Sequence, residues 1–359
     1  MEPTDVLFRT FKDILKTRLF SQTHYLSIIQ LYSKGKSMIS TFSMLIKMTR
    51  PVNIVIAAIT LVVGYMLLQH YPAVPVLILQ MLGFATAIGF ANIQNDILDF
   101  ESDKLNRPER PLVTGKVSVK TARRACYALA VIMLLCGIGD SIFQNIQFIE
   151  IVKDPALAQE FGWMGTVILS FPVWFFALLG ALLIAYNRKL KRSPIFKNIT
   201  VAFLCTTPLL YAVQHFFNFS LTANPEEYMW AIIPAIPFAF LLTTAREIYK
   251  DLEDTTGDLK AGIMTFPLVA GDKVARRLAA NIIIFTWISL PVPVFFLDKL
   301  FGHNYPPVFL AITLVTLTPC FAVAILSAHR KNYRRAQSVT KIAMFLGLIA
   351  LMICILLPS

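Results

Sequence analysis

Long apolar stretches, separated by short charged clusters, follow one another along most of the chain. Nine of them reach the length of about 20 residues that a helix needs to cross the hydrocarbon core of a bilayer. They lie at residues 50–69, 76–99, 121–143, 163–186, 198–217, 228–249, 274–297, 305–328 and 338–357. This pattern predicts an all-α polytopic membrane protein whose nine transmembrane helices account for nearly the whole chain.

The composition agrees with this class, because 56% of the residues are hydrophobic and only 15% are charged. The net charge of +12 could indicate a nucleic-acid partner, but the basic residues are neither pooled in one domain nor interleaved with aromatic residues. We therefore expect a protein whose partners include membrane lipid and no nucleic acid.

The basic residues alternate by loop. The loops after the second, fourth, sixth and eighth stretches carry Lys104, Arg107, Arg110 and Lys116; Arg188, Lys189, Lys191 and Arg192; Lys250 and Lys260; and Arg330, Lys331, Arg334 and Arg335. The intervening loops are neutral or acidic, with Asp140, Glu150, Asp154 and Glu160 after the third stretch and Glu226 and Glu227 after the fifth. By the positive-inside rule, the basic loops and the N-terminus face the cytoplasm, in the cell membrane if the source is prokaryotic.

Residues 1–44 precede the first apolar stretch and form a separate cytoplasmic extension. Its charges run throughout, which argues against a secretory signal. Apolar residues recur at helical spacing at Phe8, Phe11, Leu15 and Leu19, beside Lys12, Lys16 and Arg18. This pattern favours an interfacial amphipathic helix, with a partner-binding or disordered extension as the alternative.

The most informative charges form a first acidic cluster at the end of the second stretch, made up of Asn95, Asp96, Asp99 and Asp103. On a helix, the three aspartates fall within an arc of about 60°, and the asparagine lies one step to the side. A single acid there would suit any helix end that meets water. Three acids on one face repel one another unless a cation joins them.

A second acidic cluster lies at the end of the sixth stretch, on the same side of the membrane. It consists of Glu247, Asp251, Asp254 and Asp258, which again share an arc of about 60° on a continuous helix. Divalent metal held between the two clusters would neutralise both. Oxygen ligands without His or Cys favour Mg²⁺, or Mn²⁺ in its place. The predicted metal ligands are Asn95, Asp96, Asp99, Asp103, Asp251, Asp254 and Asp258.

Each acidic cluster is interleaved with bases that could hold a phosphate group. Arg107 and Arg110 follow the first cluster, and Arg246 and Lys250 lie within the second. Ordinary loop charge is the alternative for any one of these bases taken alone. Together with Mg²⁺, which often completes its coordination with phosphate oxygens, the bases indicate a diphosphate site.

The residues of both acidic clusters resemble motifs of a known family. The run N-D-x-x-D-x-x-x-D from Asn95 to Asp103, followed by R-P-x-R-P-L from Arg107 to Leu112, is similar to the first signature of the UbiA superfamily of intramembrane prenyltransferases. The run K-D-x-x-D-x-x-G-D from Lys250 to Asp258 is similar to the second. The segments YNRKLKR (186–192) and RPVN (50–53) also resemble segments of this family. The resemblance covers residues 45–357, both in the order of the segments and in the number of membrane spans. Residues 45–359 are therefore expected to form one membrane domain.

The resemblance implies a helical bundle around a central cavity, in which two Mg²⁺ ions and an isoprenyl diphosphate lie between the two signatures. It assigns catalytic roles to Asp96, Asp99, Asp251 and Asp254. It assigns substrate binding to Asn53, Arg107, Arg110, Tyr186, Lys189, Lys191, Arg246 and Lys250. Two roles stay open: Asn53 could instead form a hydrogen bond between helices, and Glu247 could be a ligand or a general base.

The lipophilic acceptor is less closely defined. The strings around both signatures are most similar to archaeal-type ether-lipid synthases of this superfamily, in which a geranylgeranyl group passes to the free hydroxyl of geranylgeranylglyceryl phosphate. Chlorophyll synthases and aromatic, quinone-precursor prenyltransferases are the alternatives within the superfamily. A cation-coupled transporter is the alternative from another class, but acids gathered at one membrane face and the lack of an evident repeat argue against it.

Overall fold

A computed structural model of the chain describes residues 39–151, 170–219, 229–260 and 262–356. Within these ranges every regular element is a helix, as the sequence predicts. Nine of the described helices have 17 or more residues: α3 (Pro51–Leu67), α4 (Val74–Leu98), α6 (Val119–Ile151), α8 (Phe171–Arg188), α9 (Phe196–Phe219), α11 (Ala235–Lys260), α13 (Asp272–Ser289), α16 (Pro307–His329) and α17 (Tyr333–Leu356). Short helices connect them: α5 (Phe100–Asn106), η1 (Leu190–Arg192), α12 (Phe266–Ala270), α14 (Val292–Phe295) and α15 (Asp298–Phe301). The nine long helices follow the nine predicted stretches in order.

Prolines mark where several of these helices begin. Pro51, Pro75, Pro172 and Pro307 occupy the first or second position of α3, α4, α8 and α16. Proline suits the first turn because its fixed φ is already helical and the first N–H groups of a helix have no partner within it. At the other end of α11, Gly262 adopts a φ of 67°, which turns the chain away from the helix axis.

Fewer helices than nine are apolar enough to cross a membrane alone. Among the described residues, seven helices meet this condition, and an eighth span results if α3 is counted together with Ile39–Met48, which it meets at 54°. The helix α11 is not among them, because four charged residues interrupt it from Arg246 to Asp251. The polytopic helical architecture is therefore confirmed, whereas the count of nine spans is not.

Two predicted segments fall largely outside the described residues. The expected amphipathic helix at Phe8–Leu19 lies there, as do Asp154, Glu160, Glu226 and Glu227. The helix at Ile39–Met48 crosses the position at which the sequence divides the extension from the membrane domain.

The assignment of Asp140 to an acidic loop is wrong. The helix α6 continues to Ile151, so Asp140 lies inside it with 0% of its surface exposed. Its Oδ1 accepts a hydrogen bond from Gln144 at 2.9 Å, and its Oδ2 accepts one from the Tyr211 hydroxyl. The apolar run ends near residue 143, but the helix does not, because these polar side chains find partners inside the bundle.

The exposed face of α6 indicates how the bundle meets lipid. Large apolar side chains at Tyr127, Val131, Leu134, Leu135, Ile138 and Ile142 are exposed, and they recur at helical spacing. On the opposite face, Ala122, Cys126 and Met133 are buried against neighbouring helices. A stripe of exposed apolar residues along a long helix is typical of a face in contact with hydrocarbon.

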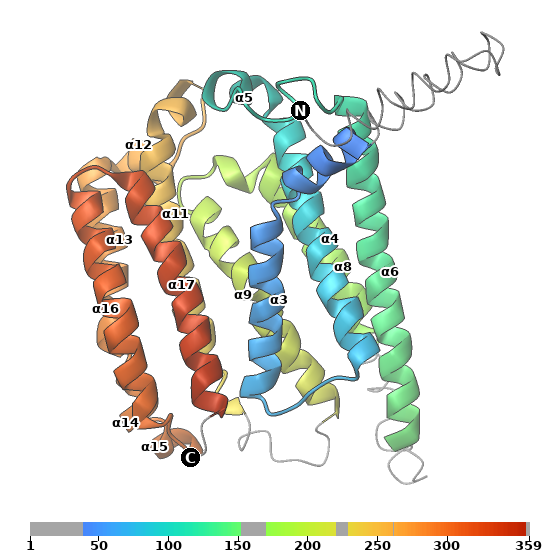
Figure 1. Cartoon of the computed structure of the whole chain (residues 1–359), viewed down its shortest axis with the longest axis vertical. Helices are drawn as coiled ribbons and strands as arrows, with labels where there is room; N and C mark the ends of the chain where they lie inside the picture. The colour runs from blue at the N-terminus through green and yellow to red at the C-terminus, as the bar shows by residue number, and fades with distance from the viewer. Residues whose placement is uncertain (1–38, 152–169, 220–228, 261, 357–359) are drawn as a thin grey trace, which may run out of the picture.

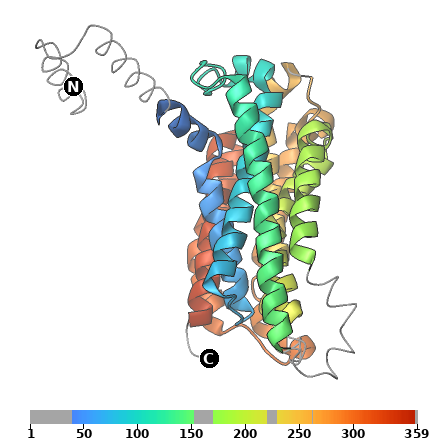
Figure 2. The ribbon, with the colours of Figure 1, turned by 90° about the vertical axis from the view of Figure 1, so that its right-hand side faces the viewer.

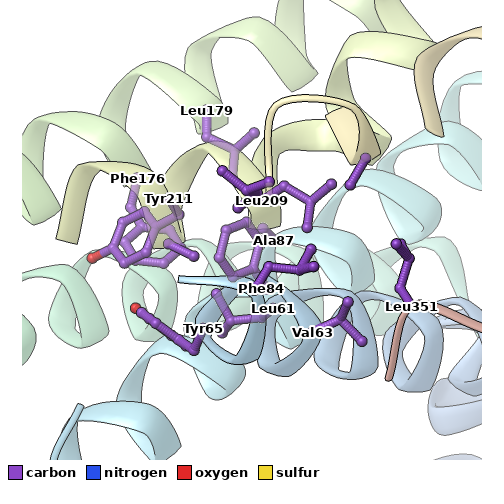
Figure 3. Packing of buried hydrophobic residues seen from close by; sticks show 14 of the residues in the cluster. Leu61, Val63, Tyr65, Phe84, Ala87, Phe176, Leu179, Leu209, Tyr211 and Leu351 are labelled. Atoms are coloured by element: carbon purple, nitrogen blue, oxygen red, sulfur yellow. The ribbon is translucent and has the colours of Figure 1, made fainter. Parts of the chain in front are cut away.

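The core between α3, α4, α8 and α9 is close-packed and aromatic (Figure 3). Phe84 of α4, Phe176 of α8 and Tyr211 of α9 meet there, with ring centroids 5.5 to 5.7 Å apart. A Cβ at Gly83 would lie 2.4 Å from Cζ of Phe176, so α4 and α8 approach this closely only because residue 83 has no side chain. These rings form an aromatic layer that joins α4, α8 and α9.

The long helices run alongside one another, so their connections gather at two ends (Figures 1 and 2). Helices α5 and α12 and the α16–α17 junction lie at the upper end in Figure 1, whereas α14 and α15 lie at the lower end. The loops predicted to be cytoplasmic therefore share one end, and the two acidic clusters lie beside them.

Candidate functional site

A cavity of about 1060 Å³ opens between helices α3, α4, α8, α9, α11, α16 and α17. Along α4 it is lined from Phe84 to Asp99, which corresponds to a length of about 20 Å. Charged and amide side chains line the end near α5, and residues such as Leu183, Phe238 and Leu317 line the remainder. The cavity therefore has a polar head and an apolar body, the shape of an amphiphilic ligand.

The first acidic cluster spans a junction between two helices. Helix α4 ends at Leu98 and α5 begins at Phe100, yet the N–H of Asp99 still bonds the Asn95 carbonyl at 2.9 Å and that of Asp103 the Asp99 carbonyl at 2.8 Å. The carboxylates therefore stay on one side of the chain. One guanidinium contacts two of them: Arg110 Nη1 lies 2.8 Å from Asp96 and also bonds Asp103.

The turn after α8 brings a lysine to the same cluster. Residues Leu190–Arg192 form the 3₁₀ helix η1, and Lys191 points from it toward α4. Its Nζ donates to both carboxylate oxygens of Asp99 and, at 3.0 Å, to Oδ1 of Asn95. The basic loop after the fourth stretch is thus attached to the first acidic cluster.

The second acidic cluster lies on the single continuous helix α11, as its spacing predicts. Asp251 is completely buried and forms an ion pair with Lys197 at the start of α9. Asp254 pairs with Arg107 at 3.2 Å. Since Arg107 follows directly after the first acidic cluster, this ion pair joins the two clusters across 147 residues of sequence.

Every aspartate named as catalytic is therefore paired with a base. The surroundings still disfavour negative charge: burial raises the pKa of Asp103 to about 6, against the effect of Arg110 and with a further rise from Asp99 and Asp96. A carboxyl group in this state gains from any additional cation placed beside it.

Some acidic oxygens have no partner. Oδ2 of Asp251 and Oδ2 of Asp258 are buried and accept no hydrogen bond from the described residues. Buried acceptors of this kind fit a hard divalent cation, which binds oxygen ligands. Among the described residues, no three acids lie close enough to form a metal site by themselves. An ion bound here would therefore complete its coordination with water or substrate oxygens.

The other predicted substrate-binding residues divide into three groups. Asn53 and Tyr186 line the cavity, and Asn53 accepts a hydrogen bond from Lys341 at 3.0 Å. Arg246 and Lys250 also line it, but both pair with Glu247. Lys189 is exposed and is not brought to the cavity, because η1 directs Lys191 inward instead. Asp96 and Asp251 lie behind the cavity surface, held there by Arg110 and Lys197.

The predicted site residues omit three bases that line the cavity, namely Arg50, Lys197 and Lys341. Arg50 lies 3.4 Å from Asp96, and Lys197 is 8% exposed. A signal for two of them exists in the sequence: Lys341 falls inside the ninth apolar stretch, and Lys197 directly precedes the fifth. A base at such a position normally faces the bundle interior or an aqueous cavity.

Comparisons with known proteins identify the relatives of this chain. The model of the UbiA prenyltransferase family matches residues 57–152 and 158–349. Digeranylgeranylglyceryl phosphate synthase of Methanopyrus kandleri is 30% identical over 319 residues, covering 87% of this chain and 98% of that protein. A solved structure concerned with digeranylgeranylglyceryl phosphate synthase in membranes has a TM-score of 0.59 and 21% identity, and the match covers 88% of this chain and 99% of that one.

A second solved structure shares the fold at greater distance. A UbiA homologue of Archaeoglobus fulgidus bound to GPP and Mg²⁺ has a TM-score of 0.50 and 18% identity, and covers 88% of this chain and 100% of its own. The family match is the decisive comparison, because it includes both acidic clusters and most of the chain. This chain belongs to the UbiA prenyltransferase family and is a prenyltransferase.

Proposed function

We propose that this enzyme transfers a geranylgeranyl group from geranylgeranyl diphosphate to the free hydroxyl of geranylgeranylglyceryl phosphate. The carbon–oxygen bond to the diphosphate breaks, an ether bond forms, and pyrophosphate and the hydroxyl proton leave. The observation that carries the proposal is the elongated cavity, whose polar head joins both acidic clusters and whose body is apolar. The relatedness to digeranylgeranylglyceryl phosphate synthases supports the choice of substrates.

The proposal includes a magnesium requirement, with two ions bound and with Mn²⁺ able to substitute. The orphaned oxygens of Asp251 and Asp258 support it, as does the Mg²⁺ in the homologue from Archaeoglobus fulgidus. We assign the ions to Asn95, Asp96, Asp99, Asp103, Asp251, Asp254 and Asp258. Bound magnesium would supply neutralisation of the charge that develops on the departing pyrophosphate.

The bases of the polar head have a matching role. Arg107, Lys191 and Lys197 each pair with one aspartate of the acidic clusters. A diphosphate entering between the clusters would lie among these cations, all three of which line the cavity. Donors fixed in advance stabilise the developing negative charge without having to reorganise, and such stabilisation is commonly the largest single contribution to rate.

The apolar body of the cavity has the complementary role of excluding water. An allylic cation formed from the donor would be captured by water unless the acceptor hydroxyl alone can reach it. Side chains such as Leu183, Phe238 and Leu242 cover this part of the cavity. We name no aromatic residue as catalytic, because in this bundle aromatic rings also serve ordinary packing.

The proposal also places the polar head on the cytoplasmic face. The Lys and Arg residues concentrate in the loops at that end, which the positive-inside rule assigns to the cytoplasm. Single cysteines introduced near residues 116 and 331 should be labelled by a membrane-impermeant reagent only after cells are opened. Labelling from outside intact cells would overturn this orientation.

The decisive experiment offers alternative acceptors in parallel. Purified protein should be given geranylgeranyl diphosphate and Mg²⁺ with geranylgeranylglyceryl phosphate, a chlorophyllide or an aromatic acid, and transfer into extractable lipid should be measured. We expect robust, EDTA-sensitive transfer to the glycerol phosphate ether. Transfer only to the chlorophyllide or to the aromatic acid would overturn the acceptor assignment.

A further inference from the structure

A second group of bases lines the cavity apart from those paired with the aspartates. It consists of Lys341 on α17 and of Arg246 and Lys250 on α11, with Asn53 of α3 beside them. Lys341 Nζ donates to Oδ1 of Asn53 at 3.0 Å, a neutral partner. Within the part of the chain that the structure describes, no acid forms an ion pair with Lys341. Its charge therefore stays available to a ligand.

Arg246 is also incompletely satisfied. Its Nη1 bonds Glu247, but its Nε is buried and finds no hydrogen-bond partner among the described residues. Arg246 and Arg50 are both electrostatic neighbours of Lys341, as is Glu247. A buried guanidinium N–H without an acceptor is costly, and an incoming anion would relieve that cost.

The charges of this group do not balance. Lys341, Arg246 and Lys250 face one carboxylate, that of Glu247, which is 1% exposed. Two positive charges are left over, which matches a phosphate monoester of about −1.5 to −2 near neutral pH. A neutral or singly charged acceptor, such as an aromatic acid, would leave part of this excess uncompensated.

The residues that continue from Lys341 suit the remainder of such a ligand. Along α17 the cavity is lined by Gln337 and Lys341 and then, at helical spacing, by Phe345, Leu348 and Leu351. Facing them, α3 contributes Asn53, Ile56 and Thr60. The two helices pack against each other, as Figure 1 also shows. A polar head followed by an apolar path of two or more turns fits a phosphate attached to a lipid chain.

We infer that Lys341, Arg246 and Asn53 form the subsite for the acceptor's phosphate, on the α3–α11–α17 side of the cavity and separate from the diphosphate site. This inference rests on the proposed function. It places this phosphate subsite away from the basic loop at 188–192, because Lys191 pairs with Asp99 and Lys189 is exposed. The diphosphate site keeps Arg107, Lys191 and Lys197.

The test compares two acceptors that differ only in phosphate. Wild type and the Lys341→Gln and Arg246→Gln variants should be assayed with geranylgeranylglyceryl phosphate and with its dephosphorylated alcohol. A lost charge-assisted hydrogen bond corresponds to roughly a 10-fold rise in KM for the phosphorylated acceptor. We expect that rise, a reduced preference for the phosphorylated acceptor, and a KM for geranylgeranyl diphosphate that changes by less than about twofold. Arg335→Gln, an exposed base on α17 outside the cavity, serves as the matched control.

A binding measurement makes the result independent of turnover. In EDTA, geranylgeranylglyceryl phosphate should raise the melting temperature of wild type and of Arg335→Gln, but of neither subsite variant. Lys341→Arg, which keeps the charge, should retain part of the effect.

The outcomes separate the two proposals. An unchanged phosphate preference in both variants, or an equal rise in both KM values, would overturn the subsite. Arg246→Gln provides the same comparison if Lys341→Gln does not fold. Wild-type transfer to neither glycerol acceptor would instead overturn the proposed function.

Discussion

Two regions of this bundle bury aspartates inside helices, and they satisfy them in different ways. At the cavity, each aspartate that the sequence predicts to be catalytic pairs with a lysine or an arginine. In the opposite half, Asp140 belongs to a distal polar cluster made up of Tyr65, Gln80, Asp140, Gln144 and Tyr211. There the Asp140 carboxylate accepts hydrogen bonds from the neutral donors Gln144 and Tyr211, and all five side chains are at most 1% exposed.

The difference shows what distinguishes a functional site from a polar cluster that only stabilises the fold. The cavity aspartates lie at or just behind a surface that a ligand can reach, and their cationic partners can turn to a phosphate instead. The distal polar cluster does not line the cavity, and it meets the cavity lining only where the ring of Tyr211 contacts that of Phe84 among the described aromatic contacts. An ionisable residue in a membrane helix is a functional candidate by default, but its partners and its access decide the matter.

The largest effect is expected when cavity aspartates are shortened. Asp96→Ala, Asp99→Ala, Asp251→Ala and Asp254→Ala should each lower kcat/KM by about 10²- to 10³-fold, because the departing pyrophosphate loses electrostatic stabilisation. The proteins should still fold, since each loss leaves a base at or near the cavity rather than an orphan in the apolar core. Glu101→Ala removes an acid of α5 that is 80% exposed and is the matched control. Normal turnover in all four variants would show that both clusters are only solvated helix ends without a catalytic role.

Much of this organisation follows from the sequence, and the exceptions have a physical pattern. Apolar stretches fix the helices, and spacings of three and four place Asp251 and Asp254 on one face, because both are local properties of the chain. The pairing of Asp251 with Lys197, or of Asn53 with Lys341, is not local: the latter pair is 288 residues apart. The hydropathy pattern does not predict that Asp140 is buried, because its partner Tyr211 lies on another helix.

The same shortening at Asp140 should act on stability instead. Asp140→Ala leaves the Tyr211 hydroxyl and the Gln144 amide without their shared acceptor, and should lower the free energy of unfolding by about 2–3 kcal/mol. The kcat of the folded fraction should change by less than about twofold, because Asp140 does not reach the cavity. Thermal melting in detergent and activity per folded molecule measure the two quantities. A stable protein with 10²-fold lower activity would show that the distal polar cluster serves catalysis.

A smaller effect is expected in the aromatic layer of Phe84, Phe176 and Tyr211. Gly83→Ala places a methyl group 2.4 Å from Phe176 Cζ, so the ring must shift, at a cost of about 1–2 kcal/mol in unfolding free energy. Gly347→Ala, where a Cβ would meet nothing within 4 Å, is the matched control and should be tolerated. An unchanged melting temperature in Gly83→Ala would mean that α4 and α8 are not tightly packed here.

The smallest effect is expected from removing a single hydroxyl in the distal polar cluster. Tyr211→Phe keeps the ring against Phe175, whose centroid lies 4.6 Å away, and removes only the hydrogen bond to Asp140. Side-chain hydrogen bonds inside membrane proteins contribute about 0.6 kcal/mol on average, so the loss of unfolding free energy should be of that size. Combining Tyr211→Phe with Asp140→Ala should add little, because the bond is already absent. Fully additive losses would show that the Tyr211 hydroxyl stabilises the bundle independently of Asp140, and the contrast with the ion-paired cavity would then rest on Gln144 alone.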